Sequence, residues 1–213
     1  MEASTPTLDE IVAAKTARAL EERALRTLFL EGRSANGFLE RPVPRELLER
    51  IVELTEHGPT STNSLPARFV FVTTPEGKER LREIVSPGNL EKTLAAPVTA
   101  IVAADLHFYE HMHRTFPHRD VRANFAGEEK AATTRQFALT NATLQGAYFM
   151  LAARAVGLDA GPMGGFDRVK CDAEFFPDGT LASIFLINLG FGDDTKLFGR
   201  LPRLPFDEVA RFV

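Results

Sequence analysis

The sequence has one cysteine and no tryptophan among its 213 residues. A single thiol, Cys171, cannot form an intramolecular disulfide or build the cysteine-rich clusters that bind zinc or iron–sulfur centres. This is compatible with a reducing compartment. The chain also lacks any run of eighteen apolar residues, and its acidic N-terminal stretch has no long apolar segment, so neither a membrane span nor a signal peptide is expected. We therefore expect a cytoplasmic location.

The chain has fewer basic than acidic residues. Lys and Arg total 25 against 29 Asp and Glu, which gives a formal net charge of −4. A protein with no global positive field is poorly suited to hold nucleic acid or an anionic membrane. Any anionic ligand must therefore be met by a local group of basic residues.

Several common site motifs are missing as well. The chain has no G-x-x-x-x-G-K-[ST] phosphate loop, no G-x-S-x-G nucleophile elbow and no H-E-x-x-H zinc motif. Its glycine-dense stretch, Gly157–Gly165, follows a helical pattern and does not spell G-x-G-x-x-G, which argues against a Rossmann site. The histidine cluster from His107 to His118 has no carboxylate or cysteine that completes a ligand pattern. We predict a solvated surface segment there and no metal.

Apolar spacing predicts one domain over residues 1–213, with the order of the first fifteen residues left open. The expected strands, buried on both faces, are residues 69–72, 97–104 and 182–189. The expected helices are residues 15–30, 44–57, 75–85 and 128–156, together with a short helix that the turn at residues 86–89 opens and that runs through Leu94. In the longest helix Phe137, Leu144 and Tyr148 share a stripe, and Ala142 and Gly146 allow close packing. Strands interleaved with helices favour a helix-and-sheet sandwich over a helical bundle or a barrel.

Four short segments carry the most specific pattern in the sequence. They are Gly32–Phe38 (GRSANGF), Gly58–Val70 (GPTSTNSLPARFV), Gly161–Phe166 (GPMGGF) and Arg200–Pro205 (RLPRLP). In order and spacing they resemble the flavin-dependent nitroreductase family, from Arg26 to Val213. The stretch SPGNLEKTLAAPVTAIVA and the closing RLPRLP look most like the malonic semialdehyde reductases of the pyrimidine-utilisation pathway. The resemblance implies an α+β sandwich with a central mixed β-sheet flanked by helices, a homodimer, and FMN as cofactor.

The resemblance also implies which residues hold the FMN phosphate. Arg33, Ser34 and Arg203 are its expected ligands, and Arg200 is a further one that matches the family pattern less well. A guanidinium group can bond two phosphate oxygens at once. An acidic protein needs such a local cluster because the phosphate carries about −1.5 to −2 charge. Asn36 is expected to add a hydrogen bond.

The remaining expected contacts surround the flavin ring. Asn89 and Lys92 would lie at the N1 and O2 edge, where a cation favours the reduced state. Pro162–Gly165 would pass N5, where glycines let backbone N–H groups approach. Pro59–Asn63 would cover the flavin from the second subunit of the homodimer. The expected cofactor-binding residues are therefore Arg33, Ser34, Asn36, Pro59, Thr60, Ser61, Asn63, Asn89, Lys92, Pro162, Met163, Gly164, Gly165, Arg200 and Arg203.

The sequence departs from the common family pattern at five positions. Gly32 and Asn36 stand where basic or polar residues are frequent, which thins the expected phosphate contacts. Leu65 and Ala67 stand in place of a Gln and a Trp, and Gly164 stands in place of a Glu. These changes reshape the substrate side and weaken an inference to broad nitroaromatic reduction. They agree with the semialdehyde reductase subgroup.

We therefore expect an oxidoreductase in which NADH or NADPH gives a hydride to FMN and a small acceptor then takes it up. The subgroup resemblance implies malonic semialdehyde as acceptor and 3-hydroxypropionate as product. No residue stands out as a general acid, so none is assigned a catalytic role. Arg68, Arg119 and Arg122 are candidate cations for a carboxylate substrate, and the loop Leu106–Gly127 is expected to cap the pocket. Nitro or quinone reduction, and FMN binding without turnover, are the alternatives.

Overall fold

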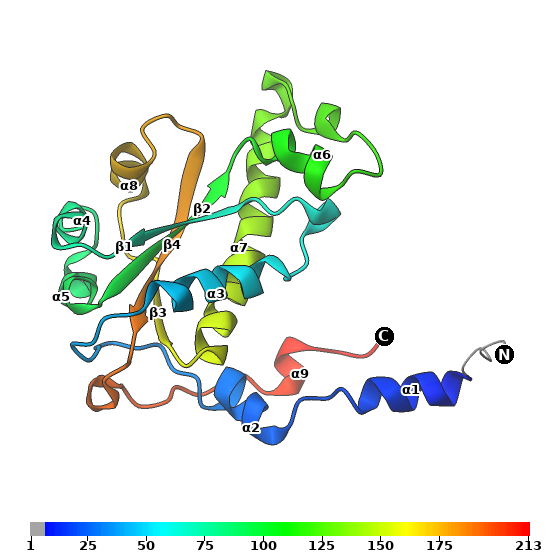
Figure 1. Cartoon of the computed structure of the whole chain (residues 1–213), viewed down its shortest axis with the longest axis horizontal. Coiled ribbons are helices and arrows are strands. Elements are labelled where there is room, and N and C mark those ends of the chain that lie inside the picture. Colours follow the sequence, from blue (N-terminus) through cyan, green and yellow to red (C-terminus); the bar gives the residue numbers. More distant parts are fainter. Residues whose placement is uncertain (1–6) are drawn as a thin grey trace.

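The computed structural model describes residues 7–213, and the first six residues lie outside the described part. Its sheet has the strand order β1-β2-β4-β3, and every neighbouring pair is antiparallel (Figure 1). The strands are β1 (Ala67–Val72), β2 (Val98–Asp105), β3 (Asp159–Met163) and β4 (Leu181–Gly190). The helices are α1 (Leu8–Thr16), α2 (Glu22–Leu25), α3 (Arg45–Glu56), α4 (Pro75–Arg80), α5 (Pro87–Ala95), α6 (Met112–Thr115), α7 (Ala131–Ala155), α8 (Arg168–Phe175) and α9 (Phe206–Val209).

Strand β2 lies inside the sheet, and all of its residues are buried. Side chains alternate between the two faces of a strand. Val98, Ala100 and Val102 accordingly join the cluster under α3 and α7, whereas Ile101 and Ala103 join the cluster under α4 and α8. A continuous apolar run is therefore required here, as the sequence predicts for a strand covered on both faces.

Helices cover the sheet in two layers, with α3 and α7 on one face and α4, α5 and α8 on the other (Figure 1). Phe149 of α7 is fully buried and stacks on Phe69 of β1 with a centroid distance of 4.6 Å. This arrangement confirms the α+β sandwich. The expectation of a mixed sheet is wrong for the four strands, which pair antiparallel throughout; the one parallel pairing between the described residues is an isolated bridge between Ser34 and Ala160.

Some expected elements are confirmed and others are wrong. The strands predicted at 97–104 and 182–189 are β2 and β4, and the helix predicted from residue 44 is α3. The helix predicted over 15–30 is partly confirmed: residues 22–30 are helical, as α2 and a π-helical turn, but the chain leaves the helical conformation at residues 17–21. Full burial of residues 69–72 is wrong: β1 is an edge strand whose middle residues are half-buried.

The predicted apolar stripe of α7 is partly wrong. Leu144 and Tyr148 are exposed, and the buried face instead carries small residues such as Ala142 and Gly146. Small side chains let the helix axis lie close to the sheet. This face of α7 is therefore the buried one, although several of its residues are less hydrophobic than Leu144 and Tyr148. None of the helices described, including the 25-residue α7, is both long enough and apolar enough to cross a membrane.

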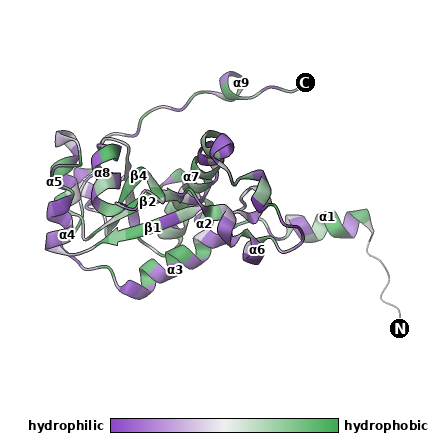
Figure 2. Ribbon diagram, turned by 90° about the horizontal axis from the view of Figure 1, so that it is seen from above, coloured by the Kyte–Doolittle hydropathy of each residue, from purple (hydrophilic) through white to green (hydrophobic). Residues whose placement is uncertain are grey.

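Both ends of the described chain stand away from the sheet (Figures 1 and 2). The sequence leaves the order of the first fifteen residues open, and within them α1 begins at Leu8. This helix is exposed along its whole length. The last segment, residues 197–213, runs over no described core cluster and exposes large apolar side chains, with Phe198 at 74% and Phe212 at 93%. These two arms carry apolar surface that the chain does not bury on itself.

Strand β3 is the edge strand that the sequence did not predict. Its Pro162 is tolerated because an edge position needs no hydrogen bond on one side. The chain segment around Ala35 runs beside β3, and the Ala35 amide donates to the Ala160 carbonyl over 3.0 Å. A Cβ on Gly161 would lie 2.4 Å from the Ala35 carbonyl oxygen, so only glycine permits this approach.

We expect the Gly161→Ala substitution to lower the free energy of unfolding by about 1–3 kcal/mol, because a rigid backbone oxygen must move. Urea denaturation measures this change. The matched control is Gly88→Ala, since no atom lies within 4 Å of a Cβ built there. Equal stability of the Gly161 and Gly88 variants would contradict the close approach.

Candidate functional site

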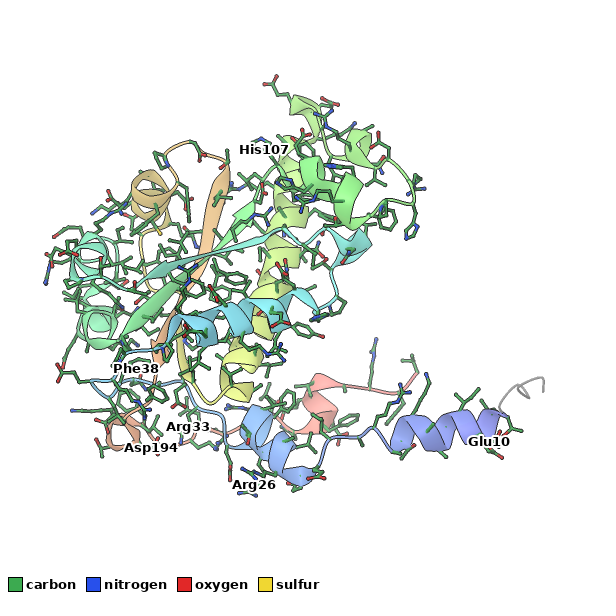
Figure 3. The ribbon with its side chains drawn as sticks, in the orientation of Figure 1. Glu10, Arg26, Arg33, Phe38, His107 and Asp194 are labelled. Atoms are coloured by element: carbon green, nitrogen blue, oxygen red, sulfur yellow. The ribbon has the colours of Figure 1, made fainter. Side chains whose placement is uncertain are left out.

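A cavity of about 550 Å³ opens beside the segment that runs along β3. Its lining includes Arg33, Arg154 and Arg200, which come from three distant parts of the chain. Figure 3 shows Arg33, Phe38 and Asp194 at this end of the molecule, far from His107. The structure therefore brings together two of the expected phosphate ligands, Arg33 and Arg200.

The three arginines of this first cavity are not used in ion pairs within the described chain. Arg33 donates to the Phe198 carbonyl, and Arg154 donates to the Leu28 carbonyl over 2.8 Å. Carboxylates of Glu31, Asp159 and Asp194 also line the cavity, and the first of these pairs with Arg26. Guanidinium groups with free donors can bind an oxyanion in a bidentate manner.

A second cavity, of about 650 Å³, shares Leu197 with the first. Asn36 and Lys92 both line it, together with Lys196. The side-chain amide of Asn36 donates to the Ser34 carbonyl over 3.3 Å, which fixes it beside the β3 edge. Asn36, expected to contact the phosphate, and Lys92, expected to contact the ring, thus line the same cavity.

The loop after β3 is tied to helix α5. The Asn89 side-chain amide donates to the Gly165 carbonyl over 2.9 Å, and the Ser86 amide donates to the same oxygen over 3.0 Å. A Cβ on Gly165 would lie 2.6 Å from the Asn89 Nδ2 atom. The ring contacts expected from Asn89 and from Pro162–Gly165 are therefore neighbours in the structure.

The segment Pro59–Asn63 lines neither cavity. The Ser61 amide donates to the Asn141 Oδ1 atom over 2.8 Å, and the Asn63 side-chain amide donates to the Thr115 carbonyl over 2.7 Å. Thr62 and Asn63 have positive φ angles of 53° and 49°, a costly conformation for residues other than glycine. Within one copy, this strained segment does not reach Arg33 or Lys92.

Arg203 also lies apart from the cavities in a single copy. Its side chain donates to the Leu201 and Pro202 carbonyls of its own exposed segment, over 3.1 and 3.3 Å. Its role as a phosphate ligand stays a prediction.

The arginines considered for a carboxylate substrate have different surroundings. Arg68 binds Asp105 over 2.6 Å. Arg122 pairs with Glu110 over 2.7 Å, and hydrogen bonding from Arg122 lowers the pKa of that carboxyl group. Arg119 lines a separate cavity of about 500 Å³ within the loop Leu106–Gly127. Arg68 and Arg122 are therefore partly neutralised.

A cavity of about 390 Å³ beside Pro59–Asn63 contains a cation that the sequence analysis did not single out, Arg114. Arg68 and His111 line the same space. Ser64 and Thr115 also belong to its lining, and their hydroxyl oxygens are buried without a hydrogen-bond partner in the described chain. The lining also includes the carboxylate of Glu56.

The described residues contain no cluster of three His, Cys, Asp or Glu side chains that could hold a metal. Burial raises the pKa of the Cys171 thiol to about 11, so it is not a nucleophile near neutral pH.

Sequence reasoning missed a buried polar group beneath the site. It consists of Lys78, Thr93, Thr99 and Asn188. Thr99 and Asn188 are polar residues inside the apolar runs of β2 and β4, and that interruption is the signal that could have found them.

Comparison with known proteins identifies the family of this chain. Residues 31–187 match the profile described as the nitroreductase family. A Burkholderia lata protein provisionally named NADH dehydrogenase/NAD(P)H nitroreductase is 54% identical over 192 residues, covering 90% of this chain and 97% of that protein. A protein of the same provisional name from Stenotrophomonas maltophilia is 52% identical, covering 91% of this chain and 97% of its own length.

Solved structures share the fold. A provisionally named nitroreductase from Exiguobacterium sibiricum, in complex with FMN, has a TM-score of 0.78 at 19% identity, covering 91% of this chain and 98% of that one. A provisionally named nitroreductase from Bacillus subtilis has a TM-score of 0.78 at 23% identity, covering 91% of this chain and all of the other. The four-segment pattern, the family profile and the relatives agree, and this chain belongs to the nitroreductase family.

Proposed function

We propose that the protein is an FMN-dependent NAD(P)H oxidoreductase whose acceptor is malonic semialdehyde. One observation is the main support for a flavin site at the β3 edge: Arg33 and Arg200 line one cavity there, and Asn36 and Lys92 line the adjoining one. The NAD(P)H nitroreductase names of relatives more than 50% identical support the nicotinamide. The acceptor rests on the subgroup resemblance of the sequence.

The donor groups at this edge fit FMN. The phosphate needs several hydrogen-bond donors with positive charge, which Arg33 and Arg200 supply. The ring needs a donor or cation at its electron-rich edge, which Lys92 supplies. The loop after β3 is held by Asn89 and has no side chain at Gly164 or Gly165, so its backbone can lie against a flat ring.

FMN, when bound, relays a hydride from NAD(P)H to the acceptor. The protein's part is to bind, orient and stabilise charge. If the ring binds in the cavity that Lys92 lines, the Lys92 side chain would favour acceptance of a hydride. In aldehyde reduction the carbonyl carbon takes the hydride and the carbonyl oxygen takes a proton, which solvent supplies in the absence of an assigned general acid.

A semialdehyde substrate also carries a carboxylate. The cavity beside Pro59–Asn63, the segment expected to cover the flavin of the second subunit, contains Arg114, which takes part in no ion pair between described residues, together with Arg68, which is paired with Asp105, and the carboxylate of Glu56. A neutral nitro or quinone compound would not need the Arg114 guanidinium group. Reduction of such neutral acceptors is the alternative, which the relatives' names favour.

We further propose that two copies form a homodimer with the flavin at their interface. The exposed apolar side chains of residues 197–213 and of α7, including Phe212 and Leu144, support an extensive contact with a second copy. Gly58 packs on Tyr148, so the strained segment Pro59–Asn63 borders the exposed face of α7. A segment in this position can reach a partner's site although it cannot reach its own.

Anaerobic spectroscopy tests the proposed reaction. The FMN-loaded protein should lose its oxidised-flavin absorbance on addition of NADH or NADPH and regain it on addition of malonic semialdehyde. The Arg114→Ala variant should bleach at the wild-type rate but need about tenfold more semialdehyde for recovery. Its recovery with a neutral nitrofuran should be unchanged.

Recovery with nitrofuran or quinone and none with semialdehyde would replace the acceptor by the alternative. Bound FMN that neither NADH nor NADPH bleaches would instead identify a flavin-binding protein without turnover.

The Arg33→Ala substitution tests the phosphate contact. Loss of a charge-assisted hydrogen bond should weaken FMN binding by about 10- to 100-fold. Quenching of FMN fluorescence by the apoprotein gives the dissociation constant. The control is Arg168→Ala, an exposed arginine of α8 that lines neither cavity. Equal FMN affinity of the two variants would place the phosphate elsewhere.

Charged substitutions in the last segment test the homodimer. The Phe206→Asp/Phe212→Asp double variant should raise the dimer dissociation constant at least about tenfold, because it removes buried apolar area. Sedimentation equilibrium measures this constant. The control is Val169→Asp on α8, which is 80% exposed and outside the expected contact. A wild-type protein that sediments as a monomer would refute the dimer.

A further inference from the structure

Lys78 of α4 is a buried lysine without a carboxylate partner. Its residue is 7% exposed, and it takes part in none of the ion pairs between described residues. Burial lowers the pKa of its amino group to about 7. Burying such a group opposes folding, whereas an apolar side chain of the same length would not. The hydrogen bonds of the Lys78 amino group indicate what this buried lysine does.

The Lys78 amino group holds the C-terminal end of helix α5. Its Nζ atom donates to the Thr93 carbonyl over 2.9 Å and to the Thr99 Oγ1 atom over 2.6 Å. Helix α5 ends at Ala95, so the Thr93 carbonyl is one of those that no helical amide can satisfy. Both the ammonium and the neutral amine carry the two N–H donors that these bonds need.

From Thr99 the hydrogen bonds continue under the site. The Thr99 hydroxyl donates to the Asn188 Oδ1 atom over 2.7 Å. The Asn188 Nδ2 atom then donates to the Lys92 carbonyl over 3.3 Å and to the Thr93 hydroxyl over 3.4 Å. The Thr93 hydroxyl in turn contacts the Met163 sulfur at 3.5 Å.

This network joins five elements, α4, α5, β2, β3 and β4, two of which carry expected site residues. Helix α5 bears Asn89 and Lys92, and β3 bears Met163. Thr93, Thr99 and Asn188 are fully buried, so water cannot replace a missing partner. Lys78 itself lines neither cavity and acts only through its neighbours.

We propose that Lys78 is a positioning residue of the flavin site, which fixes α5 against β2, β3 and β4 and so sets the placement of Lys92 and Asn89. This inference rests on the proposed flavin function. Lys78 makes no contact with substrate or cofactor.

The test compares Lys78→Met with Lys170→Met, a change of an exposed lysine on α8. In the apoprotein, amide hydrogen exchange of residues 87–95 should be at least about tenfold faster in the Lys78 variant, because the α5 carbonyl loses its donor. FMN binding should weaken about tenfold. The flavin reduction potential should also shift, a readout that lower stability alone would not move.

A second variant, Thr99→Val, removes the next link with almost no change of volume. In the Lys78→Met/Thr99→Val double variant, the losses of FMN affinity should not add, because both act through Asn188 and α5. If Lys78→Met does not fold, Thr99→Val alone decides: weaker FMN binding by a folded protein supports the inference, and wild-type affinity overturns it.

Exchange, FMN affinity and potential equal to those of Lys170→Met would overturn the inference, even with a lower melting temperature. Failure of the wild-type protein to bind FMN would refute the proposed function instead. Hydrogen exchange of α5 in the apoprotein would then still decide whether Lys78 positions this helix.

Discussion

The contact between strand β3 and the segment around Ala35 is the constraint on which the site depends. Gly161 has no Cβ, and the Ala35 carbonyl takes the space that a Cβ would fill. This approach places Arg33 and Asn36 at the edge of the sheet, beside α5 and the chain that follows β4. The segment around Ala35, β3, α5 and the chain after β4 meet there because Gly161 has no side chain to hold the Ala35 segment away from β3.

Charge is the second constraint. An acidic chain can hold a phosphate only where positive side chains are concentrated. The structure concentrates three arginines in one cavity without pairing them to carboxylates of the described chain. Beneath this surface the chain accepts a buried lysine and two buried polar side chains in the central strands. Burying these polar groups lowers the stability of the fold, and their hydrogen bonds fix the position of helix α5.

The sequence could predict the parts that local chemistry determines. Strand β2 is a continuous apolar run because both of its faces are covered. The sequence pattern pointed to residues 32–38 and Arg200, which meet near the β3 edge, but also to Pro59–Asn63, which does not reach it within one copy. Strand β3 was missed because Pro162 disfavours a strand everywhere except at an edge. The stripe of α7 was misjudged because close packing selects small residues over large ones. The contacts of Lys78 could not be predicted because they depend on the packing of α4, α5, β2 and β4 in space.

In the proposed homodimer, the β3 edge of one copy and Pro59–Asn63 of the other form one flavin site. The most direct measurement is amide hydrogen exchange of the apoprotein with and without FMN. FMN should slow exchange in four regions: residues 32–36, 87–92, 162–165 and 59–63. The last region must be protected together with the others although it lies apart from them within one copy. Protection that leaves out residues 59–63, protection that leaves out residues 32–36 and 162–165, or no protection at all would contradict a flavin site shared between two copies.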